Sequence, residues 1–218
     1  PGDYWIRMFY CYPNSFTDEV LEVMASDPRF CRYLDMPFQH ISDPVLKKMN
    51  RKITRKEIEA TMSRVRSQLP DVAWRTTFIV GFPTETDQDF EELVDFVSEG
   101  HFQHLGIFLY SDEDNIRSSK FGDPIPLSLK EERKNRLMEI QQKISREHHQ
   151  KMVGSLQQVL VGGFSSETDL LLEGRNQYQG PEVDGVVYIN EGNATSAGFH
   201  QVEITEAHEY DLVGKILN

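Results

Sequence analysis

The chain has 218 residues, with 23 lysines and arginines against 35 aspartates and glutamates, so its formal net charge is −12. That balance excludes a protein that holds nucleic acid through bulk positive charge. A hydrophobic fraction of 39% is ordinary for a folded protein. No apolar run approaches the roughly 18 to 20 residues of a membrane-spanning helix. The composition predicts a cytoplasmic protein with a core of its own and no membrane contact.

Short apolar runs alternate with amphipathic stretches through the first two thirds of the chain, which is typical of strand-helix units around a parallel sheet. Thr54 and Glu57 have the spacing of a capping box at the start of a helix, and Ser128 and Glu131 repeat that spacing before the last helix. The last helix is expected to run to about residue 151. Strands are predicted at 5–10, 33–38, 73–82 and 105–111.

From residue 153 the pattern changes to short alternating runs separated by glycine, asparagine and aspartate. Such runs favour a small β-barrel. We therefore predict an α/β strand-helix domain over residues 1–151 and an all-β barrel over residues 152–218. The barrel strands are predicted at 156–161, 170–173, 183–189, 201–205 and 212–217.

Charge is divided unevenly between these two predicted domains. Residues 152–218 contain ten acidic residues against Arg175 and Lys215, a net charge of −8. The first 151 residues therefore carry −12 − (−8) = −4. A strongly acidic barrel repels phosphate and attracts a basic partner.

Polar side chains stand where the predicted strands end, and that edge of a parallel sheet is where ligands bind. Gln39 offers a bidentate amide and Arg75 a fork of donors, which suit a ligand with hydroxyls and a carboxylate. On spacing alone Arg75 is equally a salt-bridged barrel residue and Gln39 a loop cap. His40 has no second ligand at metal-binding spacing, so no metal site and no catalytic residue are predicted.

Cys11 and Cys31 are the two cysteines of the chain. Their spacing fits no iron–sulfur motif, and we interpret both as small core residues rather than as a disulfide. Pro1 is not an initiator residue, and we expect the chain to be a piece of a longer protein.

Three segments closely resemble the radical S-adenosylmethionine methylthiotransferases. They are YLDMPFQHISDPVLKKMNR at 33–51, RTTFIVGFPTETDQDFEEL at 75–93 and LGIFLYSDED at 105–114. The fold implied is the C-terminal half of a radical SAM (partial TIM) barrel, followed by a TRAM domain, an OB-like β-barrel. The Gln39-His40 pair, PEVDGVVYI at 181–189 and EYDLVG at 209–214 resemble the branch that modifies small-subunit ribosomal protein twelve.

The resemblance implies that the full-length parent inserts a methylthio group at the β-carbon of an aspartate in that ribosomal protein. It also implies S-adenosylmethionine and two 4Fe-4S clusters, one of them held by a CxxxCxxC motif. This chain has no such motif and no third cysteine. We therefore expect the cluster ligands upstream of it, and we expect the fragment alone to be inactive.

The same resemblance implies which residues contact the cofactor. The two polar residues would reach the polar groups of S-adenosylmethionine, and the others would flank its adenine. These cofactor-binding candidates are Gln39, Arg75, Ile79, Gly81, Phe82, Phe108 and Tyr110.

The acidic barrel is expected to dock small-subunit ribosomal protein twelve, alone or within the ribosome or its subunit, and not to bind RNA directly. Two alternatives stay open. One is a tRNA methylthiotransferase of the same family with an acidic tail, and the other is a non-catalytic protein-binding module.

Overall fold

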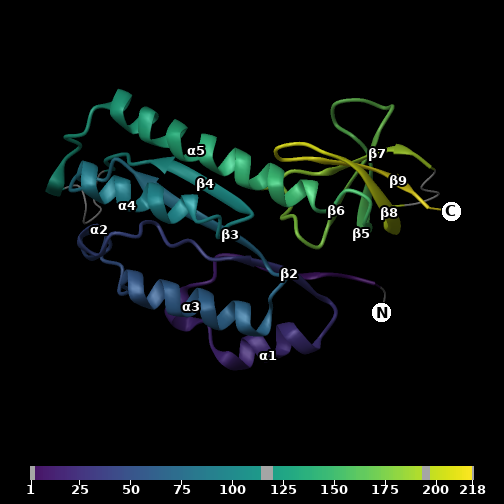
Figure 1. Cartoon of the computed structure of the whole chain (residues 1–218), viewed down its shortest axis with the longest axis horizontal. Coiled ribbons are helices and arrows are strands. Elements are labelled where there is room, and N and C mark those ends of the chain that lie inside the picture. Colours follow the sequence, from purple (N-terminus) through teal and green to yellow (C-terminus); the bar gives the residue numbers. More distant parts are fainter. Residues whose placement is uncertain (1–2, 114–119, 193–196, 218) are drawn as a thin grey trace. The chain divides into compact units, whose positions relative to one another are not determined.

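The computed structural model describes residues 3–113, 120–192 and 197–217 (Figure 1). These residues form two compact units, which we call the strand-helix unit and the barrel unit. The strand-helix unit comprises Met8–Ser26 and Leu34–Gln141, and the barrel unit comprises Pro1–Arg7, Asp27–Tyr33 and Gln142–Asn218. The predicted boundary between residues 151 and 152 stays a prediction.

Four strands form one sheet in the order β1-β2-β3-β4. Strands β3 and β4 run parallel, with Arg75 opposite His104 and Val80 opposite Leu109. The sheet with its intervening helices confirms the predicted α/β class. The strands are β1 (Ile6–Met8), β2 (Phe30–Asp35), β3 (Ala73–Val80) and β4 (His104–Leu109).

In the part of the chain that the structure describes, five α-helices and the 3-10 helix at Pro13–Ser15 separate or follow these strands. Among the described residues, no helix is both long and apolar enough to cross a bilayer. The helices are η1 (Pro13–Ser15), α1 (Asp18–Ser26), α2 (Asp43–Lys48), α3 (Arg55–Gln68), α4 (Asp87–Ser98) and α5 (Leu127–Gln150).

Capping boxes begin two of the helices. The box of Thr54 and Glu57 at the start of α3 is confirmed, with both reciprocal hydrogen bonds present. A second box, formed by Thr86 and Asp89 at the start of α4, was not predicted because an aspartate replaces the usual glutamate or glutamine. The prediction for Ser128 was wrong, because α5 already begins at Leu127 and Ser128 lies inside its first turn.

Strand β2 starts and ends three residues before its predicted position of 33–38. Pro37 lacks the backbone N–H that a central strand must donate, so the regular strand stops at Asp35. The chain nevertheless continues along β3. The Met36 N–H donates to the Arg75 carbonyl over 2.9 Å, and Gln39 forms an isolated parallel bridge with Phe78.

The core of the strand-helix unit is built largely from aromatic rings. Phe38 contacts Trp74 and Phe102 at centroid distances of 5.9 and 6.2 Å, and Phe78 meets Phe102 edge-on at 5.9 Å. Ile58 and Val65 of α3 are fully buried as well. This packing fixes the strands and thereby the positions of the loops that follow them.

Five strands close the barrel in the order β5-β6-β7-β9-β8, which confirms the predicted small β-barrel. Strands β7 and β9 pair in parallel, and the other neighbours pair antiparallel. Alternate residues of each strand point inward, and the interior is filled by aliphatic side chains such as Val159, Ile189 and Ile204. The strands are β5 (Leu156–Phe164), β6 (Leu172–Asn176), β7 (Val187–Glu191), β8 (Gly198–Ala207) and β9 (Leu212–Ile216).

Early segments of the chain belong to the barrel unit. The Trp5 ring packs edge-on against Phe199 of β8 at 4.7 Å. The Tyr33 hydroxyl donates to the Asp184 carboxylate over 2.7 Å. These contacts join residues more than 150 positions apart in the sequence. They belong to residues 1–7 and 27–33, the two early segments that form part of the barrel unit.

Gly185 is a strict packing requirement of the barrel unit. A methyl group at this position would lie 1.8 Å from the Tyr210 carbonyl oxygen, which is backbone and cannot move aside. We expect Gly185→Ala to lower the free energy of unfolding of the barrel by about 3 kcal/mol. Gly162→Ala is the matched control, because its methyl group would meet nothing closer than 3.9 Å. Urea unfolding followed by circular dichroism measures both, and equal effects would contradict this packing argument.

Candidate functional site

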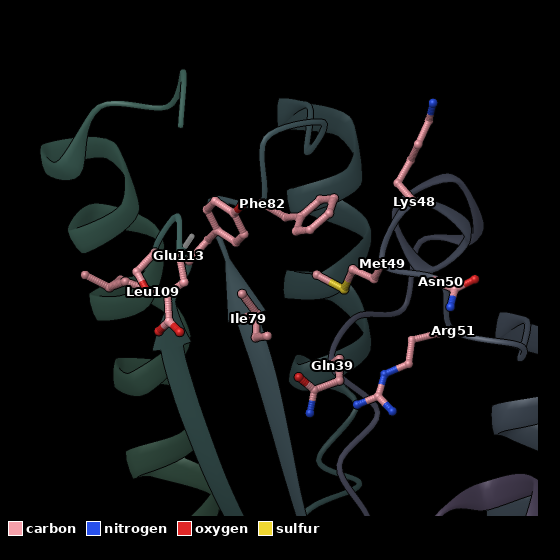
Figure 2. A pocket seen from close by; sticks show the side chains of 11 residues that line it. Gln39, Lys48, Met49, Asn50, Arg51, Ile79, Phe82, Leu109 and Glu113 are labelled. Carbon is pink, nitrogen blue, oxygen red and sulfur yellow. The ribbon is translucent and has the colours of Figure 1, made fainter. Parts of the chain in front are cut away.

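A cavity of about 470 Å³ lies in the strand-helix unit, at the carboxyl ends of β3 and β4 (Figure 2). This is the edge at which the sequence places a ligand site. The loop after α2 closes its other side. The lining residues are Gln39, Lys48, Met49, Asn50, Arg51, Ile79, Phe82, Leu109, Tyr110, Ser111 and Glu113.

Gln39 enters the cavity from a left-handed backbone conformation, with a φ of 74°. Such a conformation is costly for a residue with a Cβ and persists where the surroundings impose it. Here β3 imposes it. The Gln39 N–H donates to the Thr77 carbonyl over 2.8 Å, and the Gln39 carbonyl accepts from the Ile79 N–H over 2.9 Å. The amide side chain is thereby held beside Ile79.

Arg51 is brought to the cavity by the way α2 ends. Asn50 adopts a φ of 59°, its N–H donates to the Lys47 carbonyl over 3.1 Å, and the Arg51 N–H donates to the Leu46 carbonyl over 2.8 Å. These are the two hydrogen bonds of a Schellman motif, in which asparagine tolerates the left-handed position. Figure 2 shows the Arg51 guanidinium and the Gln39 amide directed toward the same part of the cavity.

The Arg51 guanidinium lies 5.8 Å from the centre of the Tyr12 ring. Burial lowers the pKa of Arg51 from its ordinary value. Within the described ranges, no carboxylate lies within ion-pair distance of it. A partly desolvated cation of this kind favours an anionic ligand.

An apolar wall faces these polar groups. Phe82 and Tyr110 pack edge-on at a centroid distance of 5.3 Å, and Ile79 and Met49 pack against the same cluster. Flat apolar surface beside a few fixed polar groups suits a planar ring attached to a polar chain. The cavity therefore has the chemistry of a nucleoside site.

Helix α5 supports this wall through Lys130, which is almost fully buried. Its ammonium donates to the Tyr110 carbonyl over 2.8 Å and pairs with Asp123 at 2.5 Å. Its aliphatic stem crosses Gly81, where the methyl group of an alanine would lie 2.3 Å from the lysine Cγ. One lysine thus holds the ends of β3 and β4 together.

A buried group of charges lies behind the loop that follows β3. The Glu85 carboxylate, which is inaccessible to solvent, accepts from the Gly81 N–H and lies 3.2 Å from Arg133 of α5. His40 Nε2 lies 3.5 Å from its other oxygen. These contacts join the segment after β2, the segment after β3 and helix α5.

Asp89 belongs to the same buried region. Burial alone would raise the pKa of Asp89, but hydrogen bonds from Ser42 and Thr86 hold it below its ordinary value. The Ser42 hydroxyl donates to this carboxylate. The start of α4 is thereby tied to the segment that follows His40.

Four of the seven sequence-predicted cofactor residues, Gln39, Ile79, Phe82 and Tyr110, line the cavity. The other three lie outside its lining. Arg75 pairs with the buried Asp35 at 3.0 Å, as the alternative interpretation of a salt-bridged barrel residue had it. The Gly81 N–H is engaged by Glu85, and Phe108 stands opposite Ile79 in the parallel register but is 58% exposed.

The sequence analysis missed the contribution of the α2–α3 loop, above all Arg51. The available signal was Asn50 directly after an amphipathic helix, because asparagine at that position indicates a left-handed cap and a reversal of the chain. His40 was considered only as a base or metal ligand. In the described part of the chain no group of three histidine, cysteine, aspartate or glutamate residues could hold a metal ion.

Comparison with known proteins places this geometry in a family. Residues 3–97 match the radical SAM superfamily, and residues 153–217 match the TRAM domain. The ribosomal protein uS12 methylthiotransferase RimO of Bdellovibrio bacteriovorus is 48% identical over 216 residues, which are 99% of this chain and 47% of the relative. RimO of Desulfotalea psychrophila is 46% identical over 98% of this chain and 48% of the relative.

The chain spans about half the length of these curated relatives. Among solved structures, coproporphyrinogen III oxidase HemN of Escherichia coli, described as a radical SAM enzyme, aligns with a TM-score of 0.51. That alignment covers 79% of this chain and 46% of HemN at 13% identity, so it shows the fold alone. The predicted fold class and the resemblance to the methylthiotransferases are confirmed.

The residues present fit one of the two cofactor types of this superfamily. The cavity offers a cation, amides and an apolar wall, which match the carboxylate, the ribose and the adenine of S-adenosylmethionine. They do not fit an iron–sulfur cluster. The chain has two cysteines, and burial raises the pKa of the Cys11 thiol to about 11, which disfavours the thiolate that iron requires.

Substitution of Gly81 measures how tightly Lys130 of α5 packs against the segment that lines the cavity. Both Gly81 and Gly100 have a φ above 70°, but only Gly81 has a side chain packed across it. Gly100→Ala should cost about 1 kcal/mol of stability for its backbone conformation. Gly81→Ala should cost about 1 to 3 kcal/mol more, because the buried stem of Lys130 must also be displaced. Thermal unfolding of both variants gives the difference, and equal losses would show that Lys130 yields freely.

Proposed function

Because the chain belongs to the radical S-adenosylmethionine methylthiotransferases, we propose that the whole protein transfers a methylthio group to ribosomal protein uS12, at the β-carbon of an aspartate. The similarity to the uS12 enzymes extends over 98 to 99% of the chain and supports this branch. The fragment alone would lack activity, since the cluster ligands are not among its residues. With a ribosomal protein as substrate, the protein would act in the cytoplasm.

The observation that carries this proposal is the juxtaposition of Arg51 and Gln39 with an apolar wall in one cavity. Arg51 would bind the carboxylate of S-adenosylmethionine, and Gln39 would hydrogen-bond the ribose. Ile79, Phe82 and Tyr110 would hold the adenine and keep water from it. When bound, S-adenosylmethionine supplies the radical chemistry of the superfamily.

Arg75, Gly81 and Phe108 keep supporting roles in this proposal. Arg75 is engaged with Asp35 at 3.0 Å and would shape the sheet surface next to the cavity rather than take the ligand's carboxylate. Gly81 lets the Lys130 stem pass, and Phe108 extends the surface beside Ile79. Two 4Fe-4S clusters are expected in the whole protein, with ligands from residues outside this chain.

Arg51→Gln should weaken S-adenosylmethionine binding by roughly tenfold to a hundredfold, because a charge-assisted pair with a carboxylate is lost. Arg51→Lys should recover part of the loss, since lysine keeps the charge but not the planar fork. Equilibrium dialysis of labelled cofactor against the reconstituted full-length protein measures these affinities.

Lys48→Gln is the matched control, because Lys48 lines the same cavity and its removal makes the same change in net charge. Its effect should stay within about threefold. If the Lys48 and Arg51 variants lose affinity equally, the affinity depends on the net charge around the cavity, and Arg51 is not the ligand of the carboxylate.

The barrel unit would dock the substrate protein by charge. None of its ten acidic residues from position 152 onward is buried. Among the described residues, Glu203 pairs with Lys215 at 3.2 Å and Glu209 with Arg146 at 3.4 Å. The pKa of Tyr188 is raised by burial and by the negative charges of Asp211, Glu167 and Glu173, so carboxylates gather around β6 and β7. TRAM domains bind RNA or protein, and this charge favours a basic protein.

Opposite charges attract over long distances and lose strength with salt. We therefore expect the full-length protein to bind uS12 more tightly at low salt than at physiological salt, and to bind a tRNA anticodon stem-loop weakly at both. Reversing Glu167 and Glu173 to lysine should lower uS12 affinity at low salt by roughly tenfold. Reversing the exposed Glu132 and Glu139 of α5 changes the net charge equally and serves as the control.

This binding experiment also separates the alternatives. Preferential binding of the stem-loop would favour the tRNA methylthiotransferase and contradict the docking proposal. A non-catalytic binding module would bind uS12 but not S-adenosylmethionine.

A further inference from the structure

His40 is fully buried next to the cavity but is not among its lining residues. Its Nδ1 accepts the Ser42 N–H over 3.0 Å, so the imidazole presents Nε2–H on its other side. Nε2 faces the Glu85 carboxylate at 3.5 Å. The contact with Ser42 therefore orients the ring, and its Nε2 points at the Glu85 carboxylate.

Glu85 in turn holds the backbone of the cavity. Its second oxygen accepts the Gly81 N–H, directly before Phe82 of the apolar wall. His40 directly follows Gln39, whose backbone is left-handed with a φ of 74°. The imidazole thus connects the segment that presents the polar amide with the segment that presents the apolar wall.

The charges that face His40 are balanced without a proton from it. Glu85 is paired with Arg133 at 3.2 Å, and Arg133 reaches the exposed Asp87 at 2.7 Å. Asp89 accepts from Ser42 and Thr86. A neutral imidazole can therefore direct Nε2–H at the Glu85 carboxylate, 3.5 Å away and beyond hydrogen-bond geometry, and leave the remaining pairs intact.

We infer that His40 is a positioning residue that holds Gln39 and the Gly81–Phe82 segment in the geometry that binds S-adenosylmethionine. The inference rests on the proposed function of this cavity. Without the His40–Glu85 contact the strained Gln39 backbone relaxes in most molecules. The apparent affinity for S-adenosylmethionine then falls in proportion to the fraction of molecules that keep the binding-competent geometry.

Two substitutions separate the two nitrogens of the ring. In His40→Asn the side-chain oxygen replaces Nδ1 and keeps the Ser42 contact, but no group reaches Glu85. In His40→Gln the longer amide places an N–H donor where Nε2 was. We expect the asparagine variant of the full-length protein to bind S-adenosylmethionine roughly tenfold more weakly, and the glutamine variant to stay within about threefold of the parent.

A second measurement does not depend on the cofactor. Amide hydrogen exchange of the Ile79 and Gly81 N–H groups reports the bonds to Gln39 and Glu85. The asparagine variant should lose protection there and the glutamine variant should keep it, with thermal midpoints that differ by no more than a few degrees. This result supports the inference even if the parent protein binds no S-adenosylmethionine, an outcome that would overturn the proposed function alone.

Equal exchange and equal affinity in the two variants would overturn the inference, because the reach to Glu85 would then not matter. A loss of affinity that follows a fall in thermal midpoint in both variants would assign His40 a structural role only, and would equally overturn it. Combining each variant with Glu85→Gln completes the test. The effect of the asparagine substitution should vanish when the carboxylate charge is already gone.

Discussion

The strand-helix unit depends on one buried carboxylate. Glu85 has no access to solvent, so its charge must be met by protein groups. The groups that meet it are the Gly81 N–H, Arg133 of α5 and His40 after β2. Because these partners come from three segments, satisfying a single charge fixes the relative positions of the walls of the cavity. Removing Arg133 would leave Glu85 as an uncompensated buried charge, which is more costly than losing a surface ion pair.

Much of the fold could be predicted because its signals are local. Apolar periodicity gave the helices and the closed barrel, and the Thr54 capping box marked the start of α3 at its observed residue. The errors have physical causes as well. Strand β2 was placed too late because the apolar run continues past Pro37, whose missing N–H ends the strand. The start of α5 was misplaced because Ser128 has capping chemistry but not the capping backbone position.

The candidate site could be predicted only where it follows from the strand ends. Gln39 follows from the rule that ligands lie beyond the carboxyl ends of strands, whereas Ile79, Phe82 and Tyr110 were named through the family resemblance. Arg51 does not follow from this rule, because its position depends on the left-handed turn at Asn50 rather than on a strand. The partnership of His40, Glu85 and Arg133 joins residues up to 93 positions apart, and no local spacing encodes it.

The two units use charge in opposite ways, and this follows from where the charges lie. In the strand-helix unit, the charges around Glu85 are buried and paired, so salt screens them little and their role is to fix geometry. In the barrel unit, none of the carboxylates from position 152 onward is buried and half of them are exposed, so their field extends into solvent and is strongly screened. A buried network cannot attract a distant partner, and an exposed field cannot hold a cofactor in a defined orientation. Under the proposed function, which requires both capture of a basic protein and orientation of a small zwitterion, each unit would serve one of these two tasks.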